Sequence, residues 1–148
     1  MSVSVRDFQE QDYARWLELG EGYLSFYETK LPQEVTDETW RRVLDPGRKD
    51  MFGLVAEKDG DVIGFTICVV HPGTWTMNDI CYLEDLYVDE AARGQGIGRA
   101  LIEAVYAKAQ ELNHHRVYWR TKADNKAARD LYEKVAIDNN WVMYEHHL

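Results

Sequence analysis

The chain has 148 residues, 45% of them hydrophobic, which suits one domain with a buried core and excludes wholesale disorder. Its net charge of −9 argues against a nucleic-acid-binding face, and its longest apolar run, residues 62–70, is too short to span a bilayer. Cys68 and Cys81 lie in apolar runs, which favours free thiols in a reducing cytosol over a disulfide. Residues 1–10 do not resemble a signal peptide. We therefore expect one cytoplasmic domain over residues 1–148, without a nucleic-acid or membrane partner.

The first part of the chain predicts a short strand followed by two helices. In chain order we expect a strand at 2–8, a helix at 9–22, an irregular aromatic segment at 23–35 and a helix capped by Thr36 and ending at Leu44. Asp59-Gly60 then separates two apolar, strand-like runs, which indicates a hairpin turn.

The second part predicts strands that alternate with helices. The expected strands are 52–57, 62–71, 80–88, 116–121 and 141–144, and the expected helices are 97–112 and 125–138. This order is typical of an α/β domain whose sheet mixes parallel and antiparallel neighbours.

A glycine-rich turn, Gly94-Gln95-Gly96-Ile97-Gly98, lies between the strand at 80–88 and the helix that follows. Backbone N–H groups at a helix start lack partners and the helix dipole is positive there, so the turn suits an anion. The P-loop pattern fails because no Lys-Ser/Thr follows, and the dinucleotide pattern fails because Arg99 replaces its third glycine. A tight loop with close helix–strand packing is the alternative.

The wider sequence around this turn resembles a known family. CYLEDLYVDEAARGQGIGRALIEAV resembles motif A of the GNAT superfamily of N-acetyltransferases, and DNKAARDLYEKV resembles its N-x-x-A-x-x-x-Y helix. Within the superfamily the chain looks most like the small polyamine and histone acetyltransferases, although Asn139-Asn140-Trp141 replaces the family's frequent Gly-Phe. The resemblance implies an α/β fold with a mixed, mostly antiparallel central sheet and helices on both faces, acetyl-CoA as co-substrate, and a homodimer.

The resemblance also implies where acetyl-CoA binds. The backbone of one strand segment would pair with pantetheine, the turn and its two arginines would hold the pyrophosphate, and a helix stripe would complete the site. These residues are Leu86, Tyr87 and Val88, then Arg93, Gly94, Gln95, Gly96, Ile97, Gly98 and Arg99, then Asn125, Ala128 and Tyr132.

Two acidic residues in the strand at 80–88 are candidate bases for amine deprotonation. Strand alternation places Glu84 on one face with Leu86, and Asp85 on the other face with Leu83 and Tyr87. The resemblance favours Glu84 as a water-mediated base or amine anchor. The alternatives are that Glu84 only binds a structural water or pairs with a cation, and that Asp85 forms a buried ion pair or hydrogen bond.

The helix at 125–138 carries the candidate general acid. Asn125 and Tyr132 lie seven residues apart, nearly two helical turns, so they share one stripe with the small Ala128. The resemblance implies that Tyr132 protonates the departing thiolate and that Asn125 bonds pantetheine amides. The alternatives are a core aromatic for Tyr132 and a helix N-cap for Asn125.

The first 40 residues carry three basic and nine acidic side chains, with aromatic residues interleaved. This composition predicts either a solvated face or a surface that attracts a cationic acceptor. In the second case we expect Tyr27 and Glu28, together with Glu84, to contact the substrate. We expect a small-molecule primary amine such as a polyamine, diamine or amino acid; a histone or protein lysine acetyltransferase and a non-catalytic acyl-CoA-binding module are the alternatives. The five histidines lack the spacing of metal ligands, so we expect no metal. For His71 and Trp75 we expect either a place in the acceptor pocket or packing at a hairpin tip.

Overall fold

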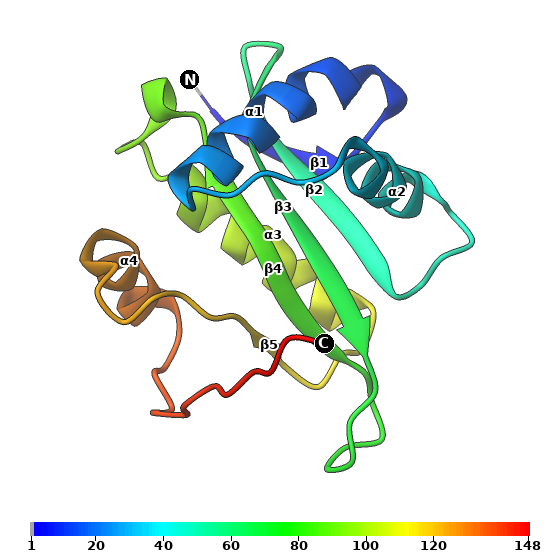
Figure 1. Cartoon of the computed structure of the whole chain (residues 1–148), viewed down its shortest axis with the longest axis vertical. Coiled ribbons are helices and arrows are strands. Elements are labelled where there is room, and N and C mark those ends of the chain that lie inside the picture. Colours follow the sequence, from blue (N-terminus) through cyan, green and yellow to red (C-terminus); the bar gives the residue numbers. More distant parts are fainter. Residues whose placement is uncertain (1) are drawn as a thin grey trace.

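The computed structural model describes residues 2–148 and is built on a five-stranded sheet in the order β1-β2-β3-β4-β5 (Figure 1). All neighbours are antiparallel except β4 and β5, which are parallel. The strands are β1 (Ser4–Asp7), β2 (Met51–Lys58), β3 (Asp61–His71), β4 (Ile80–Val88) and β5 (Val117–Tyr118). The helices are α1 (Tyr13–Phe26), α2 (Gln33–Leu44), α3 (Ile97–Glu111) and α4 (Lys126–Val135), with short 3-10 turns η1 (Glu10–Asp12) and η2 (Glu90–Ala92).

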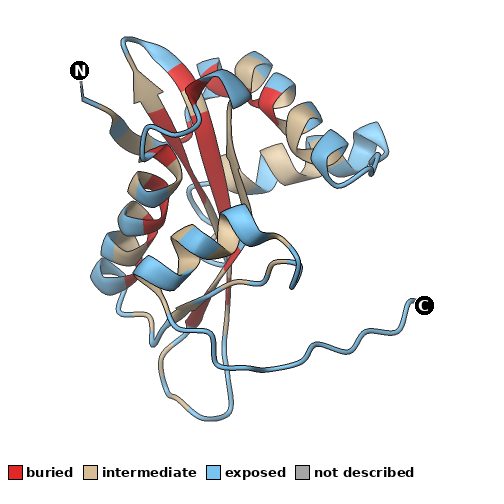
Figure 2. Cartoon of the chain, turned by 90° about the vertical axis from the view of Figure 1, so that its left-hand side faces the viewer, coloured by how far each residue is buried: buried red, intermediate tan, exposed pale blue. Residues whose placement is uncertain are grey.

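Helices cover both faces of the sheet, and the buried residues lie between the layers (Figure 2). On one face Trp16 and Leu19 of α1 pack against Phe65 and Ile67 of β3, with α2 alongside. On the other face α3 and α4 cover a second cluster, which contains both cysteines as free, buried thiols. The predicted α/β class with a mixed, mostly antiparallel sheet is confirmed.

The β2–β3 hairpin has the predicted turn. Asp59 and Gly60 both have positive φ, 54° and 84°, as a two-residue turn matched to the strand twist requires. Glycine tolerates this backbone because it has no Cβ.

A β-bulge in β4 overturns the predicted alternation of its side chains. Ile67 pairs with Asp85 while the next residue, Cys68, pairs with Leu83, so Glu84 is an extra residue in the ladder. As a result Leu83 and Leu86 both pack on the α3 face, and Tyr87 packs on the α1 face. The prediction that Leu83 shares a face with Tyr87 is therefore wrong, because strict alternation holds only in an unbroken ladder.

The predicted boundaries of the two N-terminal helices also need correction. α1 continues to Phe26, so Tyr23 is helical rather than part of an irregular segment. α2 begins at Gln33 with Pro32 before it, and Thr36 lies inside the helix instead of capping it. Pro32 is the N-cap residue, and its φ of −57° with ψ of 144° is a conformation that the fixed φ of proline allows.

The C-terminal part departs most from prediction. α4 ends at Val135 and β5 is limited to two residues. The strand predicted at 141–144 is absent, and residues 137–148 are exposed and form no strand. None of the helices within residues 2–148 is long and apolar enough to cross a membrane.

Candidate active site

The glycine turn presents unpaired backbone donors at the start of α3. Gly96 is the N-cap residue, and the first helical bond runs from the N–H of Ala100 to its carbonyl, 3.0 Å away. Within residues 2–148 the N–H groups of residues 94–99 have no acceptor. These donors and the positive end of the helix dipole give the turn the chemistry that suits an anion.

Two of the three glycines leave the space around the turn open. Gly94 and Gly96 have φ of 80° and 79°, and a Cβ added to either would have no heavy atom within 4 Å. A Cβ on Gly98 would lie 3.4 Å from Leu131 of α4. The close-packing alternative thus applies to Gly98, whereas the other two positions leave room for a ligand.

The charges around the turn differ from the predicted pair. Arg99 is held by Glu103 at 2.8 Å, and Arg93 donates to the carbonyl of Val88 at 3.2 Å. Lys58, which the sequence did not single out, donates to Gln95 at 2.7 Å and so brings a third cation to the turn. Lys58 lies far from the glycine-turn motif in the sequence, so the motif alone could not predict its place beside the turn.

A gap between β4 and β5 leaves one edge of β4 free. The two strands pair only through Cys81 with Val117 and Tyr82 with Tyr118. The following part of β4, which includes Leu86, Tyr87 and Val88, has no strand partner on that edge within residues 2–148. An extended ligand with amide groups can hydrogen-bond there as an added strand.

A small cleft lies where β4 and β5 diverge. Tyr23 reaches it from α1, and Tyr132 reaches it from α4. It brings together four residues predicted for the site with four that were not. Its lining residues are Tyr23, Tyr27, Leu83, Glu84, Leu86, Trp119, Arg120 and Tyr132.

Three other predicted residues lie outside this cleft. Glu28 is exposed and is not among its lining residues. His71 instead bonds the Tyr118 hydroxyl through Nε2 at 2.7 Å, and Trp75 is 87% exposed at the β3–β4 hairpin. His71 is therefore held by a contact beside the hairpin, whereas Trp75 neither lines the cleft nor packs at the hairpin tip.

Both carboxylates of β4 influence one tyrosine of α1. The Tyr23 hydroxyl lies near Asp85, and burial, followed by the charges of Asp85 and Glu84, raises the pKa of Tyr23. Burial, and then the charge of Glu84, raises the pKa of Asp85 to about 6. The bulge explains why two adjacent acids approach the same group, although regular alternation would have separated them.

The raised pKa of Asp85 predicts a pH-dependent stability. Because the folded carboxyl has a pKa of about 6 against an ordinary 3.8, its ionisation removes stability as pH rises between these values. We expect Asp85→Asn to raise the free energy of unfolding at about pH 8 by roughly 1–3 kcal/mol. Urea unfolding at several pH values measures this, and the gain should vanish below about pH 4. A variant less stable than the wild type at the alkaline pH would contradict the assignment.

Tyr132 has a hydroxyl that is free to donate. Its ring packs edge-on against Trp119 at 5.4 Å, and within residues 2–148 its hydroxyl has no hydrogen-bond partner. Burial raises the pKa of Tyr132, which keeps the phenol protonated at neutral pH. The side chain is thus both packed, as the core alternative predicted, and able to act as an acid.

Asn125 has the N-cap role that was predicted as an alternative. Its Oδ1 accepts from the N–H of Ala128 at 3.4 Å, and its Nδ2 donates to Thr121 at 3.2 Å. The cap fixes the start of α4 and hence the position of Tyr132, two turns further on.

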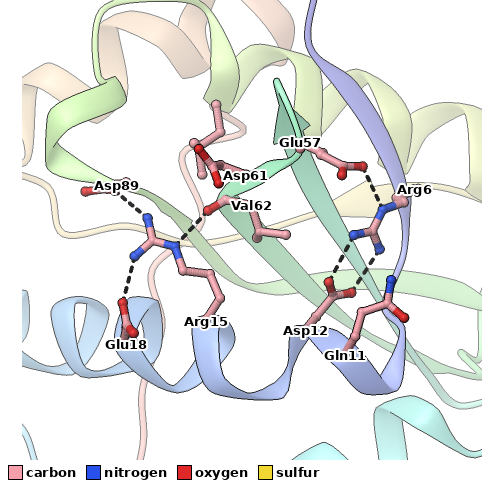
Figure 3. Close-up of a pocket in the computed structure, with 11 residues that line it drawn as sticks. Arg6, Gln11, Asp12, Arg15, Glu18, Glu57, Asp61, Val62 and Asp89 are labelled. Carbon is pink, nitrogen blue, oxygen red and sulfur yellow. Dashed lines mark hydrogen bonds and ion pairs between the residues drawn. The ribbon is translucent and has the colours of Figure 1, made fainter.

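A larger cavity of about 570 Å³ lies beside the start of α1 (Figure 3). Arg15 lies at its edge and bonds Asp89 at 2.5 Å, Glu18 at 3.0 Å and the carbonyl of Val62 at 2.9 Å. Asp89 directly follows β4, so this arginine ties α1 to the segment that leads into the glycine turn. The contact places Glu18 beside this cavity and not beside the small cleft.

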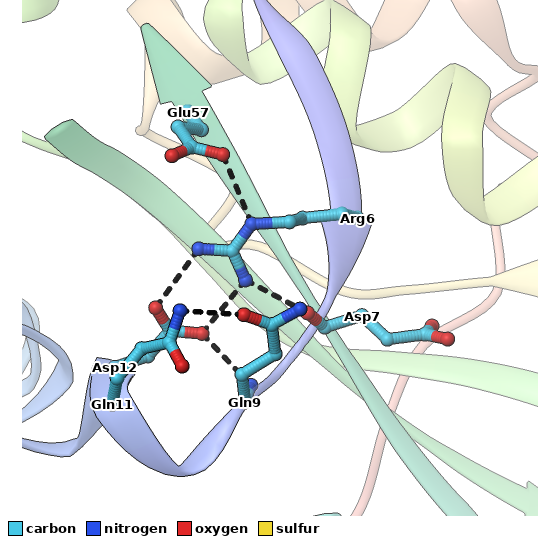
Figure 4. Close-up of polar contacts among 6 residues, drawn as sticks. All are labelled: Arg6, Asp7, Gln9, Gln11, Asp12 and Glu57. Atoms are coloured by element: carbon cyan, nitrogen blue, oxygen red, sulfur yellow. Dashed lines mark hydrogen bonds and ion pairs between the residues drawn. The ribbon is translucent and has the colours of Figure 1, made fainter. Parts of the chain in front are cut away.

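Further acids of the first 40 residues are also held in ion pairs. Arg6 bonds both oxygens of the buried Asp12 at 2.9 Å and reaches Glu57 at 3.0 Å (Figure 4). Asp7 pairs with Lys108 at 2.8 Å. These contacts hold Asp7, Asp12 and Glu18 in ion pairs outside the small cleft, which argues against a role for these three acids in attracting a cationic acceptor.

Comparison with known proteins identifies the family. Residues 11–136 match the model of the Acetyltransferase (GNAT) family. The chain belongs to the GNAT family. It is also 39% identical over 145 residues to the D-amino-acid N-acetyltransferase HPA3 of Saccharomyces cerevisiae, covering 97% of this chain and 89% of the relative. This GNAT chain is therefore an acetyltransferase.

Other similarities of the GNAT chain are more distant. A mycothiol acetyltransferase of Paenarthrobacter aurescens is 30% identical over 134 residues, which span 90% of this chain but 42% of that protein. The structure of AAC(6')-Iy with a bisubstrate analog matches with a TM-score of 0.86 at 16% identity, over 100% of this chain and 99% of that one. The last similarity establishes the shared fold. No group of three or more side chains suited to a metal is present in residues 2–148.

Proposed function

We propose that this GNAT chain transfers the acetyl group of acetyl-CoA directly to the primary amine of a small molecule, and that the acceptor is an amino acid. The observation that carries the proposal is the charge distribution of the cleft. Glu84 lines it with Asp85 close by, and Arg120 is the one cation among its described lining residues. An amino acid offers an ammonium to the carboxylates and a carboxylate to the guanidinium.

The residues of the glycine turn fit the co-substrate. The free N–H groups of residues 94–99 suit the pyrophosphate of acetyl-CoA, and Lys58 with Arg93 adds positive charge. The free edge of β4 at residues 86–88 suits pantetheine amides. Acetyl-CoA supplies the thioester whose carbonyl the amine attacks.

The side chains of the cleft support general acid–base chemistry. The acceptor amine is an ammonium near neutral pH and must lose a proton before it attacks. Glu84, with Asp85 beside it, is the proposed anchor and base, acting through water. Tyr132 is the proposed acid for the departing thiolate, because its hydroxyl is unengaged and protonated.

The relative from yeast supports an amino acid over the other acceptors expected from the sequence. HPA3 is named for D-amino-acid N-acetylation, which requires recognition of an amine beside a carboxylate. A diamine or polyamine would place a second cation near Arg120, where charges repel. The same proposal takes residues 1–148 as a single GNAT domain, and the free thiols Cys68 and Cys81 support a reducing, cytoplasmic setting.

The test compares an amino acid with its carboxamide, which keeps the amine and lacks the carboxylate. Arg120→Gln is expected to lower kcat/KM for the amino acid by about 10–100-fold, because a charge-assisted hydrogen bond is lost, and to leave the carboxamide unaffected. Arg116→Gln is the matched control, since Arg116 lies over the Tyr118 ring rather than in the cleft. Equal losses for both acceptors, or a wild-type preference for the carboxamide or a diamine, would rule out an amino-acid acceptor.

A further inference from the structure

Helix α1 supports the chain at two points just before the glycine turn. Arg15 bonds Asp89, the residue directly after β4, at 2.5 Å, and its Nε donates to the carbonyl of Val62 at 2.9 Å (Figure 3). Further along the helix, Gly22 lies so close to β4 that an added Cβ would meet the Tyr87 hydroxyl. α1 therefore lies against the end of β4, from which the chain continues into η2 and the glycine turn.

Asp89 is the residue that anchors η2. Its carbonyl accepts from the N–H of Ala92 at 2.8 Å, and its Oδ1 accepts from the N–H of Ala91 at 3.3 Å. The other carboxylate oxygen, Oδ2, is the one that Arg15 bonds. η2 ends immediately before Arg93, so the position of Asp89 determines where the glycine turn begins.

Arg93 is a cation of the glycine turn that remains available to a ligand. Its guanidinium lies 5.3 Å from the centroid of the Tyr87 ring and donates to the carbonyl of Val88 at 3.2 Å. Within residues 2–148 it pairs with no carboxylate. The pKa of Asp89 is lowered chiefly by its hydrogen bond from Arg15, and the charge of Arg93 lowers it further. Both arginines thus act on the same carboxylate, and Arg15 holds it.

We propose that Arg15 is a positioning residue for acetyl-CoA, which acts on the glycine turn through Asp89 without touching either substrate. By holding Asp89 it keeps η2 in place and prevents that carboxylate from pairing with Arg93. Without Arg15, the unpaired carboxylate would compete with the pyrophosphate for the Arg93 guanidinium. The inference rests on the proposed function, because it takes the glycine turn as the pyrophosphate site.

Arg15→Gln tests the effect on binding. Calorimetric titration should show acetyl-CoA affinity reduced about tenfold, the scale of a residue that acts through a contact network. The KM for acetyl-CoA should rise by a similar factor while kcat at saturating acetyl-CoA stays the same, because only binding is weakened. A folded Arg15→Gln variant with wild-type affinity would overturn the proposal.

A second substitution separates this role from a loss of packing. Asp89→Asn keeps the oxygen that caps η2 and removes the charge that would compete for Arg93. Added to Arg15→Gln, it should restore acetyl-CoA affinity to within about threefold of the wild type, although the ion pair is then absent. If the double variant binds no better than Arg15→Gln, Arg15 has only a structural role and the proposal is wrong.

Glu18→Gln is the matched control for the partner through which Arg15 acts. Glu18 is the other carboxylate that Arg15 bonds, at 3.0 Å, but it belongs to α1 and not to η2. This variant should bind acetyl-CoA as the wild type does. A loss as large as that of Arg15→Gln would attribute the effect to α1 itself and overturn the role of Asp89.

Gly96→Val distinguishes a failure of this inference from a failure of the proposed function. Its added side chain fills the open space at the turn itself. If Gly96→Val weakens acetyl-CoA binding and Arg15→Gln does not, only the role of Arg15 is refuted. If Gly96→Val also binds as the wild type does, the glycine turn is not the pyrophosphate site, and both proposals are overturned.

Discussion

Tyr132→Phe is expected to lower kcat on the order of 100-fold with little change in acetyl-CoA affinity. The substitution keeps the ring that packs against Trp119 and removes only the hydroxyl, which no other group engages within residues 2–148. Without it the thiolate must leave unprotonated or wait for water. Steady-state kinetics with an accepted amine, together with calorimetry for acetyl-CoA, measures the two quantities.

Tyr106 provides a matched control for this prediction. It packs in the same core cluster as Tyr132, but its hydroxyl donates to the carbonyl of Val135 at 2.8 Å. Tyr106→Phe should cost about 1 kcal/mol of stability and leave kcat unchanged. A Tyr132→Phe enzyme with near-full kcat would assign thiolate protonation to another group or to water.

Gly96→Val is expected to weaken acetyl-CoA binding by roughly 100-fold. Its added side chain would occupy the open space beside the free N–H groups of the turn, where a phosphate must approach. Calorimetric titration with acetyl-CoA measures the loss.

The strain of this substitution has to be separated from its effect on binding. Gly60 offers the control, because it has a similar φ of 84° and an equally open surrounding, but it lies in the β2–β3 turn. Gly60→Val should lose comparable stability and keep its acetyl-CoA affinity. If both variants bind acetyl-CoA as the wild type does, the glycine turn is not the pyrophosphate site.

Local signals predicted the elements that frame the proposed co-substrate site. The strand at 80–88 and the start of α3 at Ile97 agree with the structure, because the apolar runs and the glycine turn are encoded within a few residues. The Asp59-Gly60 hairpin is predictable for the same reason, since its two positive φ values depend on those residues alone.

The acceptor side of the site depends on contacts that no local pattern encodes. The bulge at Glu84 depends on how β3 pairs with β4, so alternation within β4 alone assigned Leu83 to the wrong face. Tyr23 and Arg120 reach the cleft from α1 and from the segment after β5, which are distant in sequence. The strand predicted at 141–144 has the right composition, but a strand also needs a partner, and the single chain provides none.

We propose that this GNAT enzyme acetylates the amine of an amino acid. An acceptor screen with acetyl-CoA, ranked by kcat/KM and with each product identified by mass spectrometry, decides between this and the other acceptors. We predict that amino acids rank above their carboxamides, diamines, polyamines and lysine peptides, and that each product carries one acetyl group on its amine. Binding of acetyl-CoA without turnover of any amine, or a ranking led by polyamines or peptides, would contradict it.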